Sequence, residues 1–141
     1  MAGEDGAATR RDRGPRGSSW KPWMWEILAD WQARWPAAFR RPVPLAVGFS
    51  GHIKAALRAE GMPFDRKRMS LVIQVWTREE QYLRAVARGV MRVHLDGRPA
   101  EVPDETARAE AQALLDEGAR RRAERQRAEA APDAGGEDAA A

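Results

Sequence analysis

Helix breakers at short intervals are the feature that most constrains how this sequence can fold. Apolar residues recur at helical spacing between residues 23 and 34, and Pro36 ends that helix because proline disfavours helical geometry in the residue before it. A second short helix is expected to begin with Ser50 as its N-cap and to stop at Gly61. The breakers therefore predict consecutive short helices.

Two more helices are expected in the segment that ends at Gly89. Asp65 is the expected N-cap of the first, and Thr77 with Glu80 forms a capping-box pattern that starts the second. The first amides of a helix lack intrahelical partners and carry a partial positive charge, so a restart at Thr77 predicts an anion site. The predicted buried stripe of the first helix comprises Met69, Val72, Ile73 and Trp76.

The last part of the chain combines a β signal with a long polar helix. Alternating residues flank Asp96-Gly97, a dipeptide that favours two-residue type I′ turns, and predict a β-hairpin. The expected fold class is α+β and mostly helical, with about five helices and a small β-hairpin or sheet. The expected organisation is a disordered basic tail over residues 1–19, a folded domain over 20–117, and a charged helical extension with a disordered tail over 118–141.

Five of the six Trp residues lie between residues 20 and 35. Tryptophan carries a large apolar surface with a single polar N–H, so most of these side chains are expected in the core. Trp20, Trp23 and Trp25 leave a second interpretation open, in which they lie outside the core and stack on bases or on a partner.

Charge is distributed unevenly, although the whole chain carries a formal net charge of +3. Residues 31–103 hold thirteen Lys or Arg against six Asp or Glu, a net charge of +7, whereas residues 104–141 carry −4. A basic segment attracts polyanions through its summed field and through counterion release. A plain solvated surface in an arginine-rich chain is the alternative.

Several classes of protein are not expected. The chain has no Cys, and its two histidines, His52 and His94, lie far apart in a sequence without a recognisable catalytic motif. We therefore expect no enzymatic activity, no cofactor and no metal site. The absence of Cys fits a reducing compartment, and no apolar run approaches the roughly 20 residues of a membrane helix. A soluble, cytoplasmic monomer without a membrane partner is the expectation.

The basic segment supplies candidate residues for binding a nucleic acid. If the two adjacent helices and the hairpin pack together, their cations, the helix start and one aromatic ring would converge on a concave face. There are two alternatives. The capping-box pattern at Thr77 would mark only an ordinary break between two helices, and the only Tyr would be a core residue. The candidates are Arg66, Lys67, Thr77, Arg78, Tyr82, Arg92 and Arg98.

The order of several short motifs resembles the ProQ/FinO domain of bacterial RNA chaperones. The resemblance covers about residues 32–102 and continues into the following helix to about residue 117. Its most specific pieces are Trp35-Pro36 with Phe39, Pro44-Leu45 with Gly48, Thr77 with Tyr82-Leu83, and Arg92-Val93 with Leu95-Asp96-Gly97 and Pro99.

The resemblance implies a function in RNA binding. It implies a mostly helical domain that binds structured RNAs, favouring the base of a hairpin followed by a single-stranded 3′ tail. It also implies small regulatory RNAs and mRNA 3′ ends as partners, in post-transcriptional regulation. By the same resemblance, Tyr82, Arg92 and Arg66 are binding residues, and Thr77 caps the helix that receives the RNA 3′ end.

The sequence also departs from the family pattern. Ala46, Ser70 and Gln74 occupy positions that are basic in some members, and Trp76 stands where a Tyr often precedes the Thr. Lys54 is the candidate that would compensate for the lost charge, together with Arg40, Arg41 or the N-terminal tail. A DNA-binding protein and a protein-interaction module built on the Trp-rich helix and the long C-terminal helix remain alternatives.

Overall fold

The structure is a computed structural model that describes residues 20–140, with side chains described through residue 130. This part of the chain forms six helices and no β-strand. The prediction of a mostly helical fold is confirmed. The helices are α2 (Pro22–Arg34), α3 (Pro36–Phe39), α4 (Phe49–Ala59), α5 (Arg66–Thr77), α6 (Glu80–Ala87) and α7 (Glu105–Ala140).

The predicted β-hairpin is wrong. Between residues 20 and 140, extended pairing is limited to two isolated bridges, which join Val93 in parallel to Leu45 and antiparallel to Pro99. Val93 donates its N–H to the Pro44 carbonyl, and its own carbonyl accepts the Ala46 N–H. A strand requires several consecutive residue pairs. Here Val93 is the residue that takes part in both bridges, so neither pairing extends into a strand.

The turn around Asp96-Gly97 also differs from the prediction. The His94 N–H donates to the Arg98 carbonyl at 2.8 Å, so the loop contains three residues instead of two. Gly97 has a φ of 92° at the last loop position, a pattern typical of three-residue reversals that end in a left-handed glycine. A Cβ on Gly97 would lie 2.8 Å from the Ala37 Cβ of α3, so this glycine also permits close packing.

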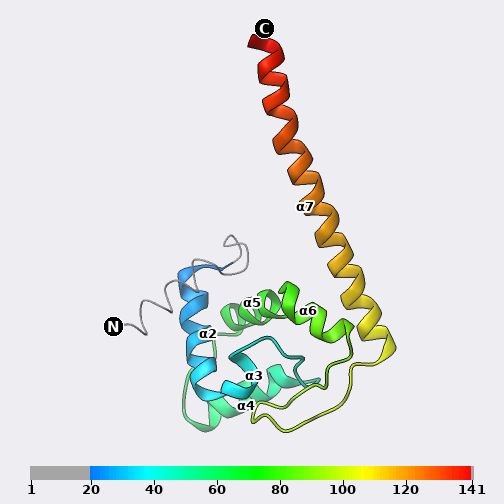
Figure 1. Cartoon of the computed structure of the whole chain (residues 1–141). Coiled ribbons are helices and arrows are strands. Elements are labelled where there is room, and N and C mark those ends of the chain that lie inside the picture. The colour runs from blue at the N-terminus through cyan, green and yellow to red at the C-terminus, as the bar shows by residue number, and fades with distance from the viewer. Residues whose placement is uncertain (1–19, 141) are drawn as a thin grey trace, which may run out of the picture.

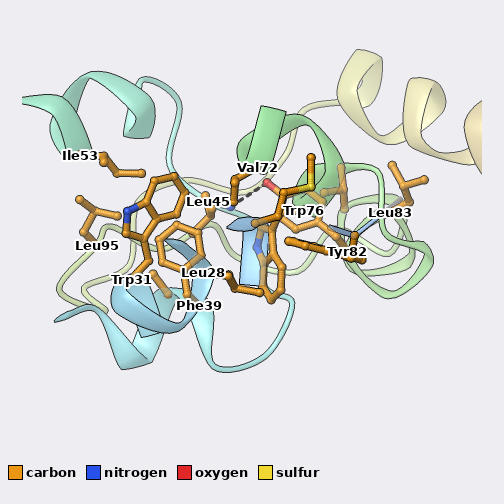
Figure 2. Packing of buried hydrophobic residues seen from close by; sticks show 14 of the residues in the cluster. Leu28, Trp31, Phe39, Leu45, Ile53, Val72, Trp76, Tyr82, Leu83 and Leu95 are labelled. Atoms are coloured by element: carbon orange, nitrogen blue, oxygen red, sulfur yellow. Dashed lines mark hydrogen bonds between the residues drawn. The ribbon is translucent and has the colours of Figure 1, made fainter. Parts of the chain in front are cut away.

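The hydrophobic core forms where α2 packs against α3 and α5. The Phe39 ring lies 5.3 Å from that of Trp31 and 5.9 Å from that of Trp76, measured between centroids. Figure 2 shows these rings with Leu28 and Leu45 between α2 and the α5–α6 segment. Trp20 is buried too, whereas Trp23 and Trp25 are half-buried and pack against the core.

Local signals predicted the helix ends better than the helix starts. Asp65 caps α5 as predicted, because its side chain accepts the Arg68 N–H at 3.1 Å. Ser50 is not the N-cap of α4, which begins at Phe49 after Gly48, a glycine with a φ of 86°. Left-handed Gly61 follows the end of α4, as predicted.

The last helix packs on α6 through its first half and then leaves the body of the domain (Figure 1). Ala111 is buried and Leu114 and Leu115 are half-buried, whereas most residues from 119 to 130 are exposed. The helix continues to Ala140. The disordered tail expected from residue 130 stays a prediction.

The predicted disordered tail over residues 1–19 lies outside the described residues. No helix within the described part of the chain is long and apolar enough to cross a membrane.

Candidate functional site

Tyr82 and Arg92 meet at the backbone of Leu45. The Leu45 N–H donates to the Tyr82 hydroxyl at 3.1 Å, and the Arg92 guanidinium donates to the Leu45 carbonyl at 2.9 Å (Figure 2 shows Tyr82 beside Leu45). These contacts join α6, the segment before α4 and the segment after α6, which are up to 47 residues apart in sequence. Two residues with a predicted binding role are therefore neighbours.

The environments of these two side chains differ. Tyr82 is only 5% exposed, so its ring is a core side chain and does not offer an open stacking platform. The core interpretation of this aromatic is the right one. Arg92 is half-buried and carries five N–H donors, of which one is directed at Leu45. The exposed part of the Arg92 guanidinium is therefore open to a ligand, whereas the face of the Tyr82 ring is not.

Burial of the ring raises the pKa of Tyr82 above its ordinary value of 10.0, while the Leu45 N–H and the charge of Arg92 oppose the shift. Because the folded pKa is higher, the free energy of unfolding should fall as pH rises past about 10 towards the folded value. Tyr82 is the only Tyr in the chain, so its ionisation can be followed directly by ultraviolet absorbance.

We expect the absorbance titration midpoint of the native protein to lie above that of the protein unfolded in urea. Tyr82→Phe should remove the tyrosinate signal and the part of the alkaline stability loss that this phenol causes. A native midpoint at or below the unfolded one would contradict the burial of the hydroxyl.

Thr77 does not cap α6, so the predicted capping box is wrong. Thr77 is the last residue of α5, and its hydroxyl donates to the Ile73 carbonyl of its own helix at 2.9 Å. Glu79 is the N-cap residue of α6 and makes no capping hydrogen bond with its side chain. The start of α6 thus lies two residues later than the pattern predicts.

The start of α6 is less favourable to an anion than a bare helix terminus would be. The carboxylates of Glu79 and Glu80 lie at its N-cap and first positions, where they already interact with the helix dipole. Glu79 accepts the Trp20 indole N–H at 3.2 Å. Glu80 forms ion pairs with Arg84 and with Arg122 of α7. A phosphate at this point would meet two negative charges.

The remaining candidates are spread over the surface. Arg66 and Arg78 flank opposite ends of α5, which at 1.5 Å per residue separates their backbones by roughly 18 Å. Lys67 is exposed beside Arg66, and Lys54 is exposed on α4. Arg98 is paired with Asp96 at 2.7 Å. Tyr82 and Arg92 are thus the two candidates that hydrogen bonds bring together, at the Leu45 peptide.

Some groups at or near this site could not be predicted from sequence motifs. The Leu45 peptide takes part through its backbone, which no side-chain motif can reveal. The rings of His52 and His94 lie 6.4 Å apart, so α4 and the segment after Arg92 are adjacent. Within residues 20–130, no cluster of three or more potential metal ligands is present.

The fold and site define a small, mostly helical domain whose middle segment exposes many basic side chains and joins a buried tyrosine to a half-buried arginine through one peptide. The chain belongs to the ProQ/FinO family, whose model matches residues 24–130. The resemblance in the sequence is therefore confirmed.

A solved structure supports the same assignment. The chain is similar to a FinO-like RNA chaperone from Neisseria meningitidis, with 28% identity and a TM-score of 0.54. The match covers 63% of this chain and 89% of that one. A search of curated proteins finds no match.

Proposed function

We propose that this protein is an RNA chaperone that binds structured RNAs at the base of a hairpin and at the single-stranded 3′ end that follows. Its biological role would be post-transcriptional regulation through small RNAs and mRNA 3′ ends. Membership of the ProQ/FinO family carries the proposal. The similarity to a protein described as a FinO-like RNA chaperone supports it.

The charge distribution supports an RNA ligand. Residues 31–103 carry a net charge of +7, and most of their Lys and Arg side chains are exposed. Phosphate contacts from such side chains release counterions, so affinity for RNA should fall as salt concentration rises. Because these contacts do not read bases, the surface suits recognition by shape and by the end of a strand.

Arg92 is the proposed centre of the binding site. One guanidinium N–H is fixed on Leu45, which orients the planar group and leaves other donors for a phosphate. Tyr82 holds the Leu45 peptide from its N–H side, so its main role would be to position the segment that carries the site. The acidic start of α6 makes the helix dipole a minor contributor.

The proposal is tested by comparing RNA ends. A labelled hairpin with a 3′ single-stranded tail should bind more tightly than the same hairpin with its tail moved to the 5′ end, and more tightly than a DNA duplex of equal length. The dissociation constants should be measured at several salt concentrations. Equal affinity for the DNA duplex would favour the DNA-binding alternative and overturn the proposal.

A further inference from the structure

The fold brings the two histidines of the chain together. His52 lies in the first turn of α4, and His94 lies far away in sequence, in the segment that follows Arg92. Their ring centroids are 6.4 Å apart and their planes are inclined by 46°, so the rings are neighbours that do not stack. The pair is separate from the hydrogen bonds that join Tyr82 and Arg92 to Leu45.

The backbone is held in place on both sides of this histidine pair. Ile53, which follows His52, is fully buried, and Leu95, which follows His94, is buried too. The His94 N–H donates to the Arg98 carbonyl at 2.8 Å, which fixes the loop that carries this side chain. Two anchored segments therefore present the two imidazoles at a defined spacing.

Both imidazoles are available to a ligand. His52 is exposed and His94 is half-buried. Within residues 20–130, neither ring is hydrogen-bonded to another group of the protein. A neutral imidazole keeps one nitrogen with a free lone pair, which makes histidine the commonest ligand of metal ions in proteins.

The spacing of the rings fits a shared metal ion. A zinc ion lies about 2.0–2.1 Å from a ligating nitrogen, which puts the ring centroid roughly 3.2 Å from the ion. Two rings on one ion are then about 5.2 Å apart in tetrahedral geometry and at most about 6.4 Å apart on opposite sides of the ion. The observed 6.4 Å is the upper limit of this range. A change of side-chain rotamer at exposed His52 can close the remaining distance of roughly 1 Å.

We propose that His52 and His94 together bind one divalent transition-metal ion of the class that prefers imidazole nitrogen, such as Zn²⁺, Ni²⁺ or Cu²⁺. The ion would join α4 to the segment after Arg92. Water would fill its other coordination positions, because residues 20–130 contain no cluster of three or more potential metal ligands. Mg²⁺ and Ca²⁺ prefer oxygen ligands and would not bind. This inference does not depend on the proposed function.

The charges around the pair permit a cation. Asp96 is paired with Arg98 at 2.7 Å, so these two charges offset each other beside His94. Lys54 lies two residues after His52, and side chains at that spacing do not share a helix face. The partial positive charge at the start of α4 weakens cation binding by about two- to fivefold. Each ligand of a four-ligand zinc site contributes on the order of a hundredfold in affinity, so two imidazoles outweigh the dipole.

The test titrates the full chain, without a histidine tag, with Cu²⁺, the first-row divalent ion that nitrogen sites bind most tightly. One ion should bind per chain, and electron paramagnetic resonance should show two nitrogen ligands. His52→Gln and His94→Gln should each weaken binding at least about tenfold, and the double variant should bind little more weakly than either. Asp116→Asn, which changes an exposed carboxylate of α7, should bind Cu²⁺ as the native protein does.

A stability measurement accompanies the affinities. Zn²⁺ should raise the Tm of the native protein by several degrees, because the folded chain holds the two histidines together and the unfolded chain does not. The Tm of His52→Gln should not respond to Zn²⁺, and Mg²⁺ should change neither Tm. His52 is exposed, so its replacement leaves the core intact and the test remains decisive if His94→Gln does not fold.

Two results would overturn the proposal. If the native protein and His52→Gln bind Cu²⁺ with equal affinity, the ion is adventitious and its ligands lie elsewhere. If the native protein binds no Cu²⁺ in a one-to-one complex, the two imidazoles do not form a site. Neither result bears on the proposed function, because RNA takes no part in these measurements.

Discussion

Replacing Arg92 by alanine is expected to weaken binding of a 3′-tailed hairpin RNA by at least about tenfold, because a charge-assisted hydrogen bond contributes roughly 1.5–3 kcal/mol. The guanidinium is half-buried and oriented by the Leu45 carbonyl, so it is preorganised for a phosphate. The slope of log affinity against log salt should also become shallower by about one phosphate contact.

Two control variants separate this effect from general loss of charge. Arg58→Ala removes an exposed arginine from α4 and should change affinity little. Arg92→Lys keeps the charge but not the planar fork, so its affinity should fall between those of the native protein and Arg92→Ala. Thermal unfolding of each variant measures how much stability is lost together with the hydrogen bond from Arg92 to Leu45. An affinity of Arg92→Ala equal to that of Arg58→Ala would remove Arg92 from the site.

Replacing Phe39 by alanine is expected to lower the free energy of unfolding by about 3–5 kcal/mol, the usual cost of truncating a buried aromatic side chain. Phe39 is fully buried, and its ring neighbours those of Trp31, Trp35 and Trp76. The cavity would therefore open at the junction of α2, α3 and α5. Urea unfolding followed by tryptophan fluorescence measures the change.

Phe49 offers a matched comparison because it is only half-buried at the start of α4. Phe49→Ala removes the same atoms from a partly solvated position and should cost clearly less. If the two variants lose equal stability, the aromatic cluster around Phe39 is not the centre of the core.

Helix ends and one helix start were predictable from the sequence. Left-handed glycines end α4 and α6 because few other residues adopt that geometry. Asp65 caps α5 because its short carboxylate reaches the Arg68 N–H. Thr77 misled the prediction because a Thr hydroxyl can also bond to the carbonyl four residues earlier, and here it does.

The hairpin prediction failed for a different reason. Alternation of residues shows that a segment can lie with one side buried, but it does not show how many partners the segment will find. Val93 bonds to Pro44 and Ala46, and backbone hydrogen bonds also link Arg92 and His94 to residues 98–101, but the bridges remain isolated. The number of paired residues depends on the course of the segment before α4, which no local pattern encodes.

The sequence by itself determined the helical character, the basic middle segment, the family and the residue types available for RNA. Only the tertiary structure decided that Tyr82 and Arg92 hold the two sides of one peptide and that the tyrosine ring is closed to solvent. The physical reason is the distance along the sequence over which each kind of interaction acts. Propensities, caps and charges act between residues close in sequence, whereas burial and contacts across 37 or 47 residues arise only when the core has formed.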